Sequence, residues 1–308
     1  MDRKGRDPRL NALEEDFFAS TNRAPPNHSR ARDDGKRRQQ HVRVVFEHHQ
    51  GPSSNLLRGF MNPSYYSTPP IRDGGSFWHF SRKEINDLTL ATLAFALALA
   101  LMQVGGMLGI LSSQETPFVL FVEMAIWGTL YIFSLGPAFL LHEMAHKFLA
   151  RYYGCWAEFR ADPSGLKTGI LIAAIIGFVF MAPGAVMVAG NITREQNGKI
   201  ALAGPISNLV LYAIGLILGG LLLGFFGISI VNNPENPSII ASFVQAWLWG
   251  NSILAAFNMI PLGPLDGRKV KQWNEPIFWI FFVGTIGLAY GTISGQVYPY
   301  LEIISNLI

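Results

Sequence analysis

Two histidines and a glutamate with the spacing of a metal site lie inside an apolar stretch, LLHEMAHKFL at residues 140–149. His142 and His146 are four residues apart, so on a helix both imidazoles project from one face and can reach one tetrahedral ion. Glu143 is one position along, where it can hold or deprotonate a water at the metal without being a ligand itself. This is the H-E-x-x-H arrangement of zinc peptidases. A chance match is the weaker interpretation, because ionisable residues within an apolar span are costly and are usually functional.

A catalytic zinc site generally has three protein ligands, so a third must come from elsewhere in the chain. Asp266 stands apart from the other acidic residues. It follows an apolar stretch at a point where Pro261, Pro264 and Gly267 interrupt the helix. Such a broken helix end can direct a carboxylate inward, although a plain helix-ending turn would have the same pattern. Two imidazoles and a carboxylate favour Zn²⁺, and other divalent ions can occupy such sites.

The elements that position these residues are predicted to be membrane-spanning helices. Half of the 308 residues are hydrophobic, which is too apolar for a soluble domain of this size. We expect an all-α polytopic membrane protein with about five or six transmembrane helices, a re-entrant or interfacial segment and a short membrane-associated β element. Stretches of about 20 apolar residues can cross the bilayer as helix. They lie at residues 88–111, 117–150, 200–226, 239–260 and 276–293, with a sixth candidate at 169–188.

The distribution of basic residues orients these spans, because short cytoplasmic loops are enriched in lysine and arginine. All nine basic residues after residue 87 fall on one side if the segment 169–188 enters and leaves the membrane on the same face. Its Pro183 and glycines suit irregular backbone inside a membrane protein. We therefore predict five full spans, an integral protein of the cell membrane, and a cytoplasmic N-terminus and active-site side.

The first part of the chain differs from the rest. Residues 1–87 contain 15 of the 24 lysines and arginines, against 11 acidic residues. Low hydrophobicity predicts a disordered cytoplasmic arm at 1–83, followed by a membrane domain at 84–308. Because acidic residues are mixed in throughout, we expect the arm to contact anionic lipid or anchor the topology, and we expect no nucleic-acid partner.

A short strand is predicted beside the metal motif. Polar and apolar residues alternate with a period of two from Cys155 to Ala161. One interpretation is that the strand pairs with an extended substrate, with Trp156 and Glu158 as substrate contacts. The other is an amphipathic loop at the membrane interface.

Three motifs in order along the chain resemble the site-2 protease family, the membrane-embedded zinc metalloproteases of peptidase family M50. They are HEMAH at 142–146, AGPISN at 203–208, and the N-x-x-P-x-x-x-x-D-G spacing at 258–267. The resemblance covers roughly residues 84–271. The segment between the first two motifs departs from the family in length, and no PDZ-like domain is evident.

The resemblance implies a role for each matching residue. His142, His146 and Asp266 would be the zinc ligands and Glu143 the catalytic base. Asn258 would orient the substrate or stabilise the oxyanion, and Asn208 has a less certain, substrate-binding role.

The function implied is hydrolysis of peptide bonds in or near the transmembrane segments of other membrane proteins. Three alternatives remain open. A prenyl-protein processing protease would take a downstream glutamate as its third ligand. A metal-binding membrane scaffold or transporter would not need Glu143. An inactive homologue would bind membrane helices without cleaving them.

Overall fold

The computed structural model describes residues 41–42, 78–231 and 238–308. The chain divides into two units, Met1–Gln39 and Gln40–Ile308, and only the second contains described residues. The predicted arm at 1–83 therefore lies outside the described residues, apart from 41–42 and 78–83. In the described part, five helices are long and apolar enough to cross a membrane. They are α3 continued by α4 (Arg82–Gln103 and Gly106–Ser112), α5 (Pro117–Tyr152), α7 (Arg194–Phe225), α8 (Ile239–Asn258) and α10 (Glu275–Ile293).

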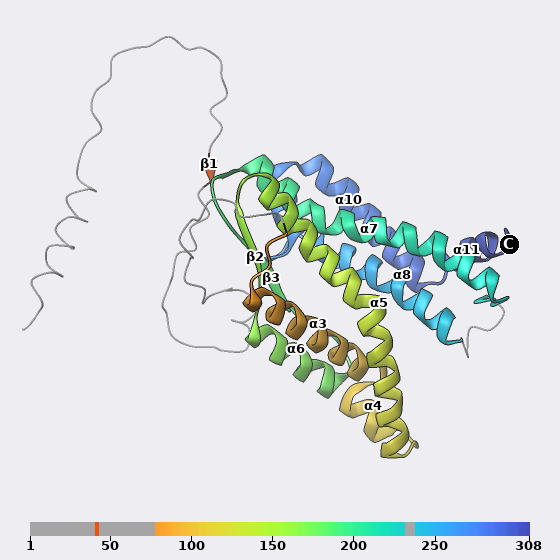
Figure 1. Ribbon diagram of the computed structural model, residues 1–308. Coiled ribbons are helices and arrows are strands. Elements are labelled where there is room, and N and C mark those ends of the chain that lie inside the picture. The colour runs from red at the N-terminus through yellow and green to blue at the C-terminus, as the bar shows by residue number, and fades with distance from the viewer. Residues whose placement is uncertain (1–40, 43–77, 232–237) are drawn as a thin grey trace, which may run out of the picture. The chain divides into compact units, whose positions relative to one another are not determined.

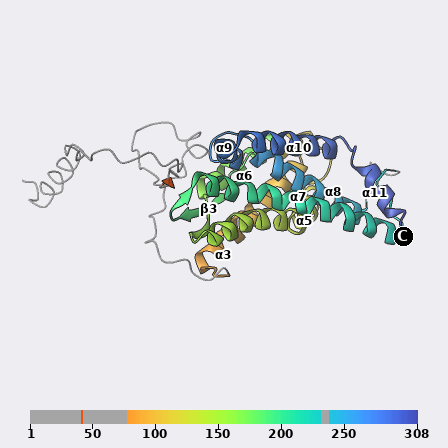
Figure 2. The same ribbon diagram turned by 90° about the horizontal axis from the view of Figure 1, so that it is seen from above.

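Helix α5 is central to the arrangement. It contacts α3 on one side and α7 and α8 on the other, and α7 and α8 lie between α5 and α10 (Figures 1 and 2). Close approach of α8 to α5 depends on Gly250, since a Cβ there would lie 2.5 Å from Cγ of Leu135. Small residues at helix contacts are a common means of tight packing in membranes. Helix α5 has 36 residues and so a length of about 54 Å, more than the hydrocarbon core requires.

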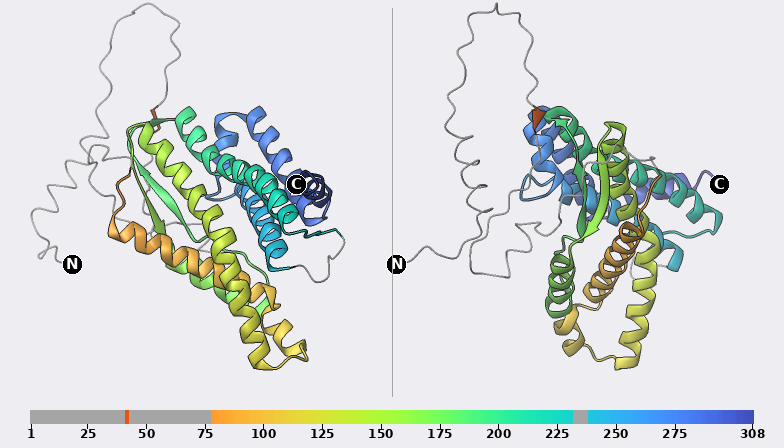
Figure 3. Two further views of the ribbon diagram at one scale, coloured as in Figure 1. Left: turned by 45° about the vertical axis from the view of Figure 1, so that its right-hand side comes forward. Right: turned by 60° about the vertical axis from the view of Figure 1, so that its left-hand side comes forward.

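The apolar segment 169–188 does not form a spanning helix. Helix α6 (Pro163–Ile176) has 14 residues and ends at Gly177 in the left-handed conformation. Its length of about 21 Å is too short for the hydrocarbon core of about 30 Å. The chain then returns as strand β3 (Gly184–Ala189). Helix α6 packs against α3 (Figure 3), so the segment enters beside a spanning helix and comes back, as the sequence predicts.

The strand predicted at 155–161 is present as β2 (Trp156–Ala161). It pairs antiparallel with β3, with Trp156 opposite Ala189 and Ala161 opposite Gly184. The short strands β1 (His41–Val42) and β4 (Ile192–Thr193) form a second antiparallel pair. Helix α7 follows β4 directly. Its start is fixed by a capping box, in which Thr193 and Gln196 exchange side-chain and backbone hydrogen bonds.

Two short helices complete the described part, α9 (Asp266–Trp273) and α11 (Tyr298–Ser305). Helix α9 begins close to the end of α8. A Cβ at Gly267 would lie 2.0 Å from the Met259 carbonyl oxygen, so only glycine allows this approach. This explains why a glycine follows Asp266: Gly267 allows the start of α9 to pack against Met259, and this packing places Asp266 in the protein interior.

A fully buried ion pair joins three of these elements. The Lys147 ammonium on α5 lies 2.6 and 2.7 Å from the two carboxylate oxygens of Glu84 on α3. It also donates to the His79 carbonyl at 2.9 Å and lies 3.6 Å from the ring centroid of Phe80. One Glu84 oxygen accepts the backbone N–H of Phe159 on β2 at 3.1 Å. The pair thus attaches the strand to the helix that carries the metal motif.

Replacing one partner of this ion pair will destabilise the fold more than replacing both partners. Lys147→Met alone leaves Glu84 as an uncompensated buried charge, and we expect a loss of about 3 to 5 kcal/mol. The double variant Glu84→Gln/Lys147→Met carries no charge, and its new amide oxygen can still accept the N–H of Phe159, so most of that loss will be recovered. Unfolding of the metal-free protein in detergent measures both. A double variant less stable than Lys147→Met would contradict this account.

Candidate metal centre

The structure brings His142, His146 and Asp266 to one point. Oδ2 of Asp266, the first residue of α9, lies 3.5 Å from Nε2 of His142 and 3.1 Å from Nε2 of His146. All three residues are buried, and their candidate ligand atoms lie within 4.8 Å of one another. Ligands on a tetrahedral zinc with bonds of 2.0–2.1 Å are separated by about 3.3 Å. The group therefore has the composition and the spacing of a zinc site.

The second ring nitrogen of each histidine is held by an acceptor. Nδ1 of His142 is 2.5 Å from Oδ1 of Asn208, and Nδ1 of His146 is 2.7 Å from the carbonyl oxygen of Ile200. A proton on Nδ1 is needed for both contacts, so each Nε2 presents a lone pair. Metal-binding histidines are normally fixed in this manner. These contacts prepare both imidazoles to bind a metal through the nitrogens that face Asp266.

Gly204 of α7 lies directly against the imidazoles of His142 and His146. A Cβ at this position would lie 2.5 Å from Nε2 of His142 and 2.5 Å from Nε2 of His146. No side chain, even a methyl group, fits there without moving the imidazoles. The glycine of the AGPISN motif is thus explained by the close approach of α7 to the Nε2 atoms of both histidines.

Glu143 and Lys269 are the charged neighbours of the ligands. Glu143 is buried and close enough to His142, Asp266 and the backbone of Val186 on β3 to interact electrostatically with them. Lys269 donates to Oδ1 of Asp266 at 3.1 Å. Burial by itself raises the pKa of Asp266, but in the absence of a metal the charges of Lys269 and of a doubly protonated His146 imidazolium outweigh burial and hold that pKa well below its usual range. Asp266 is therefore a carboxylate, the form that binds a metal.

The remaining predicted site residues lie elsewhere or face inward. Asn258 ends α8 and donates to the Leu254 carbonyl of its own helix at 3.0 Å. Glu158 is buried, ion-paired with Arg160, and accepts the Ser81 hydroxyl at 3.1 Å. Trp156 is half-buried at the start of β2. Roles of these residues toward a substrate stay predictions.

Asn208 lies next to a candidate metal ligand, and its predicted role toward a substrate stays a prediction. Its side chain is fully buried, and besides His142 it contacts Ala138 and Asn251. It lies behind a ligand, where it orients the imidazole. Asn251 was not singled out by sequence reasoning, although a polar residue inside an apolar span was a usable signal.

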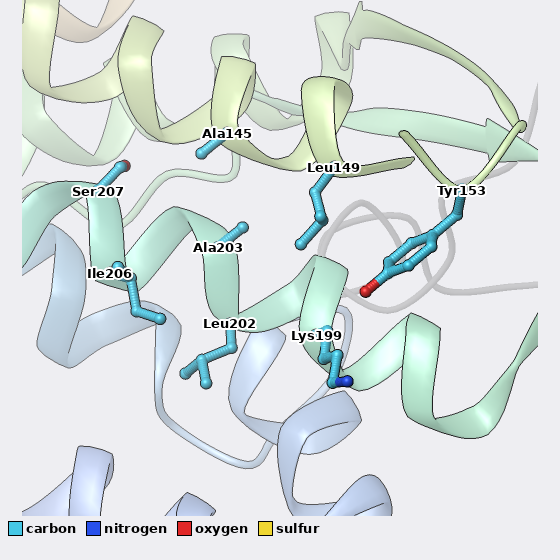
Figure 4. Close-up of a pocket in the computed structure, with 8 residues that line it drawn as sticks. All are labelled: Ala145, Leu149, Tyr153, Lys199, Leu202, Ala203, Ile206 and Ser207. Carbon is cyan, nitrogen blue, oxygen red and sulfur yellow. The ribbon is translucent and has the colours of Figure 1, made fainter. Parts of the chain in front are cut away.

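A groove of about 470 Å³ runs along the seam between α5 and α7 (Figure 4). Ala145 and Ala203 line it. Ala145 directly precedes His146, and Ala203 directly precedes Gly204. The Tyr153 hydroxyl points toward Lys199 at one end of the groove (Figure 4). The other lining residues are Leu149, Leu202, Ile206 and Ser207. No residue in this lining is an acid or a histidine, so the groove adds no metal ligand.

Comparison with known proteins agrees with this geometry. The model of peptidase family M50 matches residues 130–273. A Methanocaldococcus jannaschii protein named "Putative zinc metalloprotease" is 36% identical over 213 residues, covering 66% of this chain and 91% of that protein. A Bacillus subtilis protein of the same name is 27% identical over 154 residues, covering 46% of this chain and 67% of that protein. No solved structure shows significant similarity to the chain. The metal that the family and these names imply is zinc, and the His–His–Asp group fits it.

Proposed function

This chain belongs to peptidase family M50, the site-2 protease family, and on that premise we propose that it is an intramembrane zinc metalloendopeptidase of the site-2 type. Its substrates would be membrane proteins, cleaved in or next to a transmembrane segment. The observation that carries the proposal is the buried group of His142, His146 and Asp266 with Glu143 beside it, on helices apolar enough to span a bilayer.

The chemistry follows from the position of each residue. His142, His146 and Asp266 would hold the zinc ion. When bound, the ion supplies a Lewis acid and makes water a competent nucleophile near neutral pH. Glu143 accepts the proton of the attacking water and delivers it to the leaving amine. Asn258 is proposed to orient the substrate or to donate to the developing oxyanion.

The exposed edge for an extended substrate belongs to β3, not β2. On the outer side of β2, Arg151 donates to the Ala157 carbonyl at 3.2 Å and Glu84 accepts the N–H of Phe159. Main-chain groups of an antiparallel strand alternate in direction, so Val186 and Val188, opposite Phe159 and Ala157, face away from β2. The backbone of Val186 lies near Glu143. We propose that a locally unwound substrate pairs with this edge and so lies against the catalytic base.

Proline at position 188 tests the pairing. Val188→Pro removes an N–H that faces away from β2 and leaves the ladder between the strands intact, so we expect catalytic efficiency to fall by about 10-fold. Val188→Ala keeps the N–H and will cleave like the wild type. Initial rates on a single-span substrate measure the effect, with bound zinc and thermal stability measured in parallel. Undiminished cleavage by the proline variant would exclude β3 as the docking edge.

The metal requirement tests the proposed function directly. A chelator will stop cleavage of tagged single-span substrates by the purified protein in lipid vesicles, and Zn²⁺ will restore it, because without the ion no Lewis acid activates the water. Mass spectrometry of the fragments will place the cut in or next to the span. Cleavage by metal-free protein would refute a metalloprotease mechanism. Cuts confined to soluble segments would refute the intramembrane assignment.

The location and orientation are proposed from charge. We propose an integral protein of the cell membrane whose active-site end is cytoplasmic. The basic residues that support this lie at the end of α5, in β2, in the first half of α6, at the start of α7 and in α9. They are Lys147, Arg151, Arg160, Lys167, Arg194, Lys199, Arg268, Lys269 and Lys271.

A further inference from the structure

We propose that Asn251 of α8 is a positioning residue for the metal ligand His142 and that it acts through Asn208 of α7. The proposal rests on the proposed function only in taking zinc as the metal. Asn251 and Asn208 are both fully buried. Neither belongs to the His–His–Asp group, and the hydrogen bonds of the Asn251 side chain go to Asn208 and Trp247.

The hydrogen bonds of the two asparagines have a defined direction. Asn251 donates its amide to the carbonyl oxygen of Trp247 at 2.9 Å. Its Oδ1 accepts from Nδ2 of Asn208 at 3.1 Å, and the same Nδ2 donates to the Ala138 carbonyl at 3.1 Å. Oδ1 of Asn208 then faces Nδ1 of His142 at 2.5 Å. The chain of contacts crosses from α8 through α7 to the metal motif on α5.

Only these orientations of the Asn208 and Asn251 amides give every donor an acceptor and every acceptor a donor. If the Asn208 amide were flipped, its oxygen would face two acceptors, Oδ1 of Asn251 and the Ala138 carbonyl. Asn251 cannot flip in its turn, because its own oxygen would then face the Trp247 carbonyl. Burial makes each such mismatch costly, since no water replaces the missing bond.

The consequence reaches the metal through the tautomer of His142. With Oδ1 of Asn208 as acceptor, the imidazole proton stays on Nδ1 and the lone pair of Nε2 points toward Asp266. A flipped amide would instead donate to Nδ1 and move the proton to Nε2, which blocks the metal. Asn251 therefore favours the metal-binding tautomer without touching the metal.

Zinc affinity of the purified full chain tests this relay. Asn251→Leu keeps the bulk of the side chain and removes the acceptor, and we expect zinc affinity in competition with a chromophoric chelator to fall about 10- to 100-fold. The visible absorption spectrum of the Co²⁺-loaded protein will shift as well. Ser252→Ala is the matched control, because Ser252 is a buried residue on the same helix whose hydroxyl donates to the Trp249 carbonyl of that helix. Its affinity and spectrum will stay those of the wild type.

A double-mutant cycle separates the relay from a general packing effect. In an Asn208→Leu background, Asn251→Leu will cause no further loss of zinc affinity, because its route to His142 is already cut. Asn251→Ser, whose side chain is too short to reach Asn208, will reproduce the loss if the leucine variant does not fold. Wild-type zinc affinity in both Asn251 variants, or a full additional loss in the double variant, would overturn the proposal. Wild-type protein that binds no zinc would instead refute the proposed function.

Discussion

Glu143→Gln will reduce peptide cleavage by about 10³-fold or more and leave zinc bound. Glutamine has the size of glutamate and fits the same buried position. It cannot take the proton of the attacking water or return one to the leaving amine. The three ligands are unchanged, so the metal content will equal that of the wild type. Cleavage of single-span substrates in lipid vesicles, with bound zinc measured in both proteins, provides the comparison.

A matched substitution in the same helix controls for the loss of a carboxylate. Glu123→Gln makes the same chemical change in α5, 20 residues before Glu143, and we expect full activity. Equal cleavage by the wild type and Glu143→Gln would remove Glu143 from the mechanism. If neither protein cleaves any substrate although both hold zinc, the metal-binding scaffold or transporter becomes the better account of the chain.

Gly204→Ala will abolish zinc binding, and cleavage with it. The new methyl group would lie 2.5 Å from Nε2 of both His142 and His146, so at least one imidazole must move out of line with Asp266. Removal of a residue that hydrogen-bonds to a metal ligand typically lowers metal affinity by about 10- to 100-fold. We expect Gly204→Ala to lower zinc affinity by more than this, because it displaces a ligand itself. Competition with a chelator measures this loss independently of any substrate.

Gly287→Ala provides the control for adding a methyl group to a membrane helix. A Cβ at Gly287 of α10 meets nothing within 4 Å, so zinc affinity and stability will stay near those of the wild type. Zinc bound by Gly204→Ala with wild-type affinity would mean that the metal does not occupy the space in front of the two imidazoles.

The local parts of the site could be read from the sequence. The spacing of His142 and His146 places them on one helical face whatever the rest of the chain does, because helix geometry is local. Spans could be found from composition, since a bilayer demands about 20 apolar residues in a row. Asp266 was recognisable because prolines and a glycine break the helix before and after it. In these cases a few neighbouring residues contain the whole signal.

The structure of segment 169–188 could be predicted only in part from its local sequence. The sequence indicated that it does not cross, from the basic residues around it. It did not reveal that residues 184–189 form a strand, because alanine, valine and methionine suit an apolar helix as well as a buried strand. Pairing with β2, and hence the choice of β3 as the edge beside Glu143, depends on a partner more than 20 residues away.

The sequence by itself therefore determined the membrane spans and the metal motif with its glutamate, because helical periodicity and bilayer solvation act residue by residue. Only the tertiary structure decided what surrounds them. It placed Asn208 behind His142, brought Gly204 against the imidazoles of His142 and His146, and paired Glu84 with Lys147 across 63 positions of the chain. These features depend on which helix faces meet, and helices in a membrane meet through shape and buried hydrogen bonds that no single segment encodes.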